Sequence, residues 1–363
     1  MAPIDQLFPK QSERLARARA DLRVGLAVRI DGPIPVLVSA IETLTPERFD
    51  ALRSLGPTPH IAITHWRAEV LKARAYDGDL ARIVLPRDAN LAWARALADP
   101  ALDLDHPMKG PFNSLRGGTA DAERAGLNLA KAAHLLPAVI VVEQTEATEA
   151  LVPYLTSLSQ EDAGTAHSAL LQDVVSARLP IAVSPQARLH VFRPNDGSEE
   201  HYAIEVGTID RSKPVLTRLH SACFTGDVIG SLKCDCGPQL NGALEQMGAE
   251  GSGVLLYLNQ EGRGIGLSNK MRAYSLQNQG FDTVEANHRL GFEDDERDFR
   301  LGAALLKALK VPQVRLLTNN PAKVAKLIDQ GIEVTDRVAL KPGKNPFNEA
   351  YLATKAAKSG HLL

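Results

Sequence analysis

The second half of this chain takes its fold from one stretch, Val215-Leu-Thr-Arg-Leu-His-Ser-Ala-Cys-Phe-Thr-Gly-Asp-Val-Ile-Gly-Ser-Leu-Lys-Cys-Asp-Cys-Gly-Pro-Gln239. It begins with an apolar run over 215–220 that predicts a buried strand. It ends at Gly237-Pro238-Gln239, which is typical of a helix start. A strand that leads through a loop into a helix is the repeating unit of an α/β domain.

The loop of this stretch contains all three cysteines of the chain, Cys223, Cys234 and Cys236. An odd number of thiols cannot close into disulfides, and clustered thiols without pairing fit a reducing cytoplasm. Three thiolates are the soft ligands that Zn²⁺ prefers, and they leave a fourth tetrahedral position open, as at a catalytic site. Two other interpretations stay open: His220 as a fourth ligand of a structural site, or three buried cysteines without a metal.

Composition excludes several classes of protein. Of 363 residues, 44% are hydrophobic and 23% charged, as in ordinary globular proteins, and the length predicts two domains. The net charge of −2 indicates neither a nucleic-acid nor a membrane partner. We expect no signal peptide and no transmembrane helix, because no apolar run has the required length.

Strands alternate with helices in both halves, which predicts an α/β protein with mixed sheets and two domains. Turn-forming residues occur at Pro185 and at Pro194-Asn-Asp-Gly197, which is typical of a linker. We therefore place the domains at 1–185 and 186–363. In the second domain we expect strands at 201–209, 215–220, 254–258 and 314–318, and helices at 238–249, 268–279, 299–309, 321–330 and near 349–358.

Polar clusters follow these strands, where open α/β sheets bind ligands. Gln260-Glu-Gly-Arg-Gly-Ile-Gly266 combines close backbone approach with an arginine, although most glycine triplets are simple turns. In Thr318-Asn-Asn-Pro-Ala-Lys323, a capped helix start beside a lysine predicts an anion site or an ordinary capped helix. Gln239, at a helix start, offers a donor and an acceptor for a purine edge.

Seven segments, in order over roughly residues 200–340, together resemble the GTP cyclohydrolase II family, zinc enzymes that open riboflavin biosynthesis. They are Arg218-Leu-His-Ser-Ala-Cys-Phe-Thr-Gly-Asp227, Gly230-Ser-Leu-Lys-Cys-Asp-Cys-Gly237, Gln260-Glu-Gly-Arg-Gly-Ile-Gly-Leu267, Asn269-Lys-Met-Arg-Ala-Tyr274, Asp282-Thr-Val-Glu-Ala-Asn287, Asp295-Glu-Arg-Asp298 and Leu317-Thr-Asn-Asn-Pro321. The resemblance implies that a homodimer hydrolyses GTP to 2,5-diamino-6-(5-phosphoribosylamino)pyrimidin-4(3H)-one, formate and pyrophosphate.

The resemblance also implies a metal and a substrate site. Cys223, Cys234 and Cys236 would hold one Zn²⁺, which makes hydroxide available near neutral pH for attack at carbon 8 of guanine. Mg²⁺ would accompany the phosphates. The positions that match GTP contacts are Arg218, Leu219, His220, Ser221, Gln239, Glu261, Gly262, Arg263, Thr283, Thr318 and Lys323.

Three further positions match catalytic residues. Asp295 matches the proton acceptor, and Tyr274 the residue associated with completing both hydrolysis steps. Arg297 matches the proposed nucleophile on the α-phosphorus, but arginine does not normally lose its proton, so clamping the phosphate is an equally physical role. Two alternatives remain: an enzyme that stops at the formamide, and a zinc-stabilised guanine nucleotide-binding module without turnover.

Departures from the family's pattern fall outside these catalytic positions. Ala222 stands where many members have Glu, and Asn259 and Lys233 each replace a common Arg. A contact at Ala222 would therefore use the backbone or be absent.

Residues 20–175 resemble 3,4-dihydroxy-2-butanone 4-phosphate synthase, which is fused to many family members. That chemistry needs several acids in an early loop, and here Asp31 stands alone. Gly118 and Ala120 stand where the synthase has His and Glu. We therefore interpret the first domain as degenerate and inactive.

Overall fold

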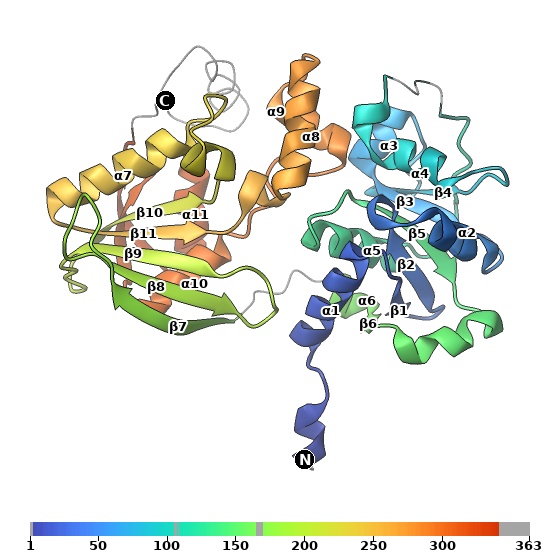
Figure 1. The fold of residues 1–363 in the computed structure, drawn as a ribbon, viewed down its shortest axis with the longest axis horizontal. Coiled ribbons are helices and arrows are strands. Elements are labelled where there is room, and N and C mark those ends of the chain that lie inside the picture. The colour runs from blue at the N-terminus through green and yellow to red at the C-terminus, as the bar shows by residue number, and fades with distance from the viewer. Residues whose placement is uncertain (1–2, 105–106, 108, 165–169, 341–363) are drawn as a thin grey trace. The chain divides into compact units, whose positions relative to one another are not determined.

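The computed structural model describes residues 3–104, 107, 109–164 and 170–340, in two compact units, each of which contains one sheet (Figure 1). Unit 1 comprises residues 1–167 and 268–296, and unit 2 comprises 168–267 and 297–363. The predicted class, α/β with mixed sheets and two domains, is confirmed.

The sheet of unit 1 has six strands in the order β4-β3-β5-β2-β1-β6. Only β1 and β6 pair in parallel, and the other neighbours are antiparallel. The strands are β1 Val28–Asp31, β2 Val36–Ala40, β3 His60–Thr64, β4 Leu80–Val84, β5 Ala138–Glu143 and β6 Ser157–Ser159.

Helix α5 covers the middle of this sheet because a glycine lets it approach closely. A Cβ on Gly126 would lie 2.7 Å from Cγ1 of Val38, so only glycine fits there. The helices of unit 1 are α1 Gln11–Arg23, α2 Pro46–Ser54, α3 His65–Leu71, α4 Leu91–Ala98, α5 Asp121–Ala132, α6 Gln160–Gly164, α8 Leu267–Asn278 and α9 Thr283–Leu290. Thr45 caps α2 by accepting from the amide of Arg48, and Pro46 is its first residue.

Helices α8 and α9 belong to unit 1, although about 100 residues of unit 2 separate them in the sequence from the rest of unit 1. Arg272 donates to Glu42 over 2.9 Å and to Asp99 over 3.2 Å. The rings of Trp66 and His288 stack with centroids 3.6 Å apart. Residues 268–296 therefore form an inserted part of unit 1.

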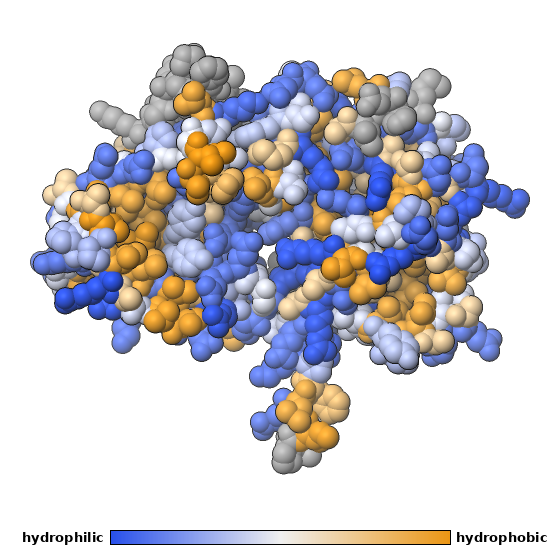
Figure 2. Space-filling view, viewed as in Figure 1, coloured by the Kyte–Doolittle hydropathy of each residue, from blue (hydrophilic) through white to orange (hydrophobic). Residues whose placement is uncertain are grey.

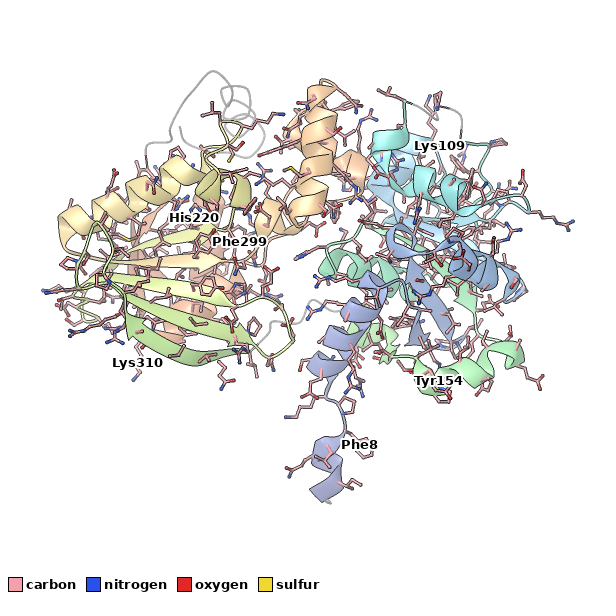
Figure 3. All side chains as sticks on the ribbon, viewed as in Figure 1. Phe8, Lys109, Tyr154, His220, Phe299 and Lys310 are labelled. Atoms are coloured by element: carbon pink, nitrogen blue, oxygen red, sulfur yellow. The ribbon has the colours of Figure 1, made fainter. Side chains whose placement is uncertain are left out.

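The described chain begins with a 3₁₀ segment, Pro3–Leu7, in which the side chains of Ile4 and Leu7 are exposed. Figure 2 shows apolar surface at this end, and Figure 3 labels Phe8, which is 66% exposed. These side chains add nothing to the core of unit 1, which begins at Ala18.

The sheet of unit 2 has seven strands in the order β13-β12-β10-β11-β9-β8-β7. Strands β10 to β13 are parallel to one another, and β9, β8 and β7 continue the sheet in antiparallel fashion. The strands are β7 Leu171–Arg178, β8 Arg188–Pro194, β9 His201–Gly207, β10 Val215–Ser221, β11 Ser252–Leu258, β12 Gln313–Leu317 and β13 Glu333–Val338.

Helices cover both faces of this sheet because successive strand residues point in opposite directions. On β11, Leu255 packs in the cluster of α7 (Cys236–Glu250), whereas Val254 and Leu256 pack in the cluster of α10 (Arg300–Ala308). Helix α11 (Pro321–Asp329) lies beside α10. Strands with two covered faces explain the continuous apolar runs of the sequence.

One expectation differs from the structure. The region in which the domain boundary is expected contains β8, and Pro194-Asn-Asp-Gly197 forms part of the hairpin connection between β8 and β9, so the expected boundary at 185/186 lies inside unit 2. The polar segment 283–287 belongs to helix α9. The helix expected near 349–358 lies outside the described residues.

Among the described residues, no helix combines the length and the apolar character that a membrane crossing requires.

Unit 1 contains a buried charged cluster around Glu123 of α5. The Glu123 carboxylate lies 2.9 Å from Nε2 of His60 and 3.8 Å from Nη1 of Arg82, and all three side chains are at most 7% exposed. Burial raises the pKa of Glu123, but the hydrogen bond and charge of His60 outweigh it, and the net effect is a lowered pKa.

We expect Glu123→Ala to lower the free energy of unfolding of unit 1 by about 3–5 kcal/mol, because it leaves buried His60 without its carboxylate and leaves buried Arg82 with Asp77 alone. The matched control is Asp79→Ala, which removes a surface pair with Arg124 and should cost less than about 1 kcal/mol. Both tryptophans, Trp66 and Trp93, lie in unit 1, so tryptophan fluorescence during urea unfolding reports this unit alone.

The same measurement has a pH dependence. Because the folded pKa of Glu123 is lowered, its contribution is complete above the ordinary carboxyl pKa and is lost as pH falls through the folded value. Equal losses in the two variants would show that the Glu123 cluster is not specifically stabilising.

Candidate active site

The site of unit 2 forms where three parallel strands end at one edge of the sheet. Strand β10 pairs with β11 on one side and with β12 on the other. The segments that follow these strands carry the polar clusters identified in the sequence, and parallel pairing gathers them. Figure 3 shows His220 and Phe299 at this end of the sheet of unit 2.

The three cysteines converge beside this edge. Their Sγ atoms all lie within 4.8 Å of one another, and those of Cys223 and Cys234 are 3.7 Å apart. A tetrahedral zinc site with bonds of about 2.3 Å has sulfur–sulfur edges of about 3.8 Å. The donor set therefore fits zinc in both chemistry and spacing.

A glycine makes room for this cluster. A Cβ on Gly226 would lie 2.7 Å from Sγ of Cys234 and 3.1 Å from Sγ of Cys223. The amide of Gly226 also donates to Sγ of Cys223 over 3.3 Å. Any side chain at this position would push the sulfurs apart.

The crowded thiols resist ionisation without a cation. The Cys223 thiol raises the pKa of Cys234 and of Cys236, and burial adds to both effects. Because a divalent cation removes this repulsion, the cluster suits a metal better than free thiols.

His220 is not part of this donor set. Its Nε2 lies 3.0 Å from Oδ2 and 3.1 Å from Oδ1 of Asp227, and the metal-ligating group found among the described residues contains only the cysteines. Burial lowers the pKa of His220, which favours a neutral ring. The structure therefore favours three thiol ligands over a structural site with His220 as the fourth.

Arg218 and Gln239 form a chain of hydrogen bonds next to the thiols. Arg218 donates to the carbonyl of Leu317 over 3.0 Å and to Oε1 of Gln239, and Gln239 donates to buried Asp235. Burial lowers the pKa of Arg218 to about 10, still far above neutrality, so its charge persists. Gln239 thus presents its amide in a fixed orientation.

The loop after β11, Glu261–Gly264, has a strained backbone that is held by hydrogen bonds. Gly262 and Arg263 both have φ of 63°, a left-handed conformation that is unfavourable for arginine. Glu261 braces the loop by accepting from the amides of Phe224 and Gly262. Such strain is often found at ligand-binding loops.

Three cationic side chains surround the ring of Phe299. The charged groups of Arg297, Lys323 and Lys326 lie 5.0, 5.6 and 4.5 Å from the ring centroid. Arg297 also donates to Oγ of Ser221 over 3.3 Å. These cations converge near the capped start of α11, which is suited to an anion.

Two further predicted residues lie in the same network. Lys323 donates to the carbonyl of Leu219 over 3.2 Å, and the hydroxyl of Thr318 accepts from the amide of Asn320 over 3.0 Å. Leu219 therefore offers its backbone to this part of the site.

Buried polar atoms at this edge lack partners within the described part of the chain. They are Nε of Arg218, Nδ1 of His220 and Oε1 of Gln260. Each such atom costs roughly 1–3 kcal/mol, which a polar ligand can recover by pairing with it. This edge of the sheet can therefore bind a polar ligand that supplies the missing hydrogen-bond partners.

Three predicted residues lie in unit 1 instead. Tyr274 is on α8, Thr283 begins α9, and Asp295 follows α9. Thr283 accepts from Gln277 over 3.2 Å, and Nζ of Lys270 lies 5.8 Å from the centroid of the Tyr274 ring. Asp295 and Arg297, two residues apart, fall on opposite sides of a unit boundary.

Sequence reasoning missed Asp227, Gln260 and Lys326. Lys326 follows Lys323 by three residues on a helix, a spacing that places both on one face and that the sequence does show. Asp227 and Gln260 lie inside the matching segments but carry no signal of burial.

Comparisons with known proteins agree with this geometry. The sequence profile of the GTP cyclohydrolase II family matches residues 172–339. A protein of Azospirillum brasilense named GTP cyclohydrolase-2 is 42% identical over 376 residues, which cover 99% of this chain and 97% of that protein. One of the same name from Azotobacter vinelandii is 57% identical over 175 residues, covering 48% of this chain and 84% of that protein.

Among solved structures, a two-domain 3,4-dihydroxy-2-butanone 4-phosphate synthase from A. baumannii covers 88% of this chain and 98% of its own, at 16% identity. Its TM-score of 0.31 is too low to support any statement about this chain. The full-length relative, the matching profile and the cysteine cluster lead to one conclusion: the chain belongs to the GTP cyclohydrolase II family.

Proposed function

We propose that this protein hydrolyses GTP to 2,5-diamino-6-(5-phosphoribosylamino)pyrimidin-4(3H)-one, formate and pyrophosphate, the first step of riboflavin biosynthesis. The observation that carries the proposal is the three-thiol cluster beside an edge lined with orphaned polar atoms and cations. A pure binding module has no need of an open set of three metal ligands.

Cys223, Cys234 and Cys236 would hold one zinc ion, which when bound supplies the Lewis acidity that makes hydroxide available near neutral pH. Gln239, held between Arg218 and Asp235, offers the remaining capacity of its amide to the guanine edge. The unpaired acceptor Nδ1 of His220 is available to a donor on the base or the sugar.

The cations around Phe299 would bind the triphosphate, together with Mg²⁺. Arg297 is held by Ser221 and the Phe299 ring, which suits a fixed phosphate clamp. We favour electrostatic clamping over nucleophilic attack, because an arginine side chain does not normally lose its proton. Arg263, in its strained loop, is a further candidate contact for the substrate.

We keep the catalytic roles that the family resemblance implies for two residues. Asp295 would accept a proton, and Tyr274 would help to complete the second hydrolysis step.

The function is tested by incubating the full-length protein with GTP and Mg²⁺ and measuring formate, pyrophosphate and pyrimidine together. We expect all three in equal amounts. Pyrophosphate without formate would indicate an enzyme that stops at the formamide. Bound GTP without either product would indicate the nucleotide-binding module.

In the same assay, Lys323→Ala should lose about 1.5–3 kcal/mol of phosphate binding, seen mainly as a raised KM. Lys307→Ala, a change of an exposed lysine on α10, is the control and should behave as the parent.

We expect about one zinc per chain, and we expect Cys234→Ser to lose it together with GTP turnover, since the thiolate count sets affinity. His190→Gln, a change of a buried histidine of unit 2, is the control and should keep zinc. The measurement is metal analysis after dialysis, with tryptophan fluorescence showing that unit 1 stays folded. If Cys234→Ser keeps one zinc per chain, the thiols do not bind the metal.

Unit 1 should not convert ribulose 5-phosphate, with or without Mg²⁺. Asp31, the lone acid of its early loop, is paired with Arg29 over 3.0 Å, and the carbonyl of Gly117 and that of Thr119 accept from Arg82. No general base or metal-binding cluster of acids is therefore offered among the described residues of these loops. Formation of 3,4-dihydroxy-2-butanone 4-phosphate above a no-enzyme control would overturn this interpretation.

A further inference from the structure

A buried carboxylate behind the thiol cluster has no assigned role. Asp227 lies on the turn Phe224–Val228 between the first and second cysteines, and its side chain is 3% exposed. Burying a carboxylate is costly unless donors surround it. Its hydrogen bonds therefore indicate what it is there to hold.

Three donors from three segments converge on this carboxylate. His220 Nε2 on β10 lies 3.0 Å from Oδ2, and the hydroxyl of Tyr257 on β11 donates to the same oxygen over 3.0 Å. The third donor is the backbone amide of Cys223, also 3.0 Å from Oδ2.

The register of the sheet places the first two donors side by side. His220 and Tyr257 are direct partners in the parallel pairing of β10 and β11, and their rings stack with centroids 5.5 Å apart. Burial, followed by the Asp227 carboxylate, raises the pKa of Tyr257, so its phenol remains a donor. The position of Asp227 is thus fixed by two adjacent strands.

The third donor, the amide of Cys223, connects the Asp227 carboxylate to a metal ligand. The amide of Asp227 also donates to the carbonyl of Cys223 over 2.7 Å, so the two residues are joined in both directions. The backbone of Cys223 cannot turn without breaking both bonds. Its Sγ is thereby held 3.7 Å from that of Cys234.

We propose that Asp227 is a positioning residue of the metal centre, which transfers the rigidity of strands β10 and β11 to Cys223. This inference rests on the proposed zinc site. Partners that orient metal ligands typically change metal affinity about 10–100-fold when they are replaced.

The test is the zinc affinity of the full-length protein by competition with a chelator, with the absorption spectrum of the cobalt-substituted protein as a second readout. We expect Asp227→Asn to weaken zinc binding about 10–100-fold, because the amide carries no charge and puts an NH₂ donor in place of one of the two oxygens that lie near Nε2 of His220. Its cobalt–thiolate absorption should also change. Tyr257→Phe, which removes one donor and keeps the ring, should weaken binding several-fold.

The matched control is Glu205→Gln. Glu205 is also a buried carboxylate of unit 2 that contacts a histidine, His190, and an arginine, Arg211, but it lies on β9 and contacts no cysteine. This variant should keep the parental zinc affinity and cobalt spectrum, even if it is less stable.

The outcomes separate the inference from the proposed function. If the parent binds zinc and folded Asp227→Asn binds it equally well with an unchanged spectrum, the positioning role is overturned alone. If Asp227→Asn does not fold, unchanged affinity in Tyr257→Phe overturns it. A parent that takes up no zinc overturns both the zinc site and this inference.

Discussion

The parallel pairing of β10 with both β11 and β12 is the constraint on which the site in unit 2 depends. It puts three strand ends at one edge, so that segments about 40 to 100 residues apart in the sequence meet there. The register also matters for each side chain, because a slip of one residue would turn Arg218 and His220 to the opposite face. The apolar packing on both faces of the sheet therefore fixes the polar chemistry at its edge.

The edge itself is expensive to maintain. It contains a buried arginine, a buried histidine–aspartate pair and an arginine in a left-handed conformation. Such features cost stability and persist only when the surrounding structure determines them. The covered sheet of unit 2 supplies that support, while Gly226 leaves the thiols enough space to approach one another.

The sequence predicts strands β10, β11 and β12, helices α7, α10 and α11, and the three clustered cysteines, because these features have strong local signals. Buried strands such as β11 are continuous apolar runs, and helix α11 has a cap, a proline and a regular period. Strands β7, β8 and β13 are not predicted. Strands β7 and β13 are exposed along most of their length and so lack the alternation of a half-buried strand. The role of Asp227 depends on a contact across strands, and no local pattern encodes such a contact.

The inserted position of residues 268–296 has a consequence for synthesis of the chain on the ribosome. The chain enters unit 2 at residue 168, returns to unit 1 at 268 and leaves it again at 297. Unit 1 therefore cannot receive α8 and α9 until β7 to β11 have been made, and unit 2 must wait longer still for β12 and β13. Domains that are continuous in sequence can fold one after the other as they emerge. Here unit 1 is completed only after strands β7 to β11 of unit 2 have emerged, so the folding of the two units overlaps during synthesis.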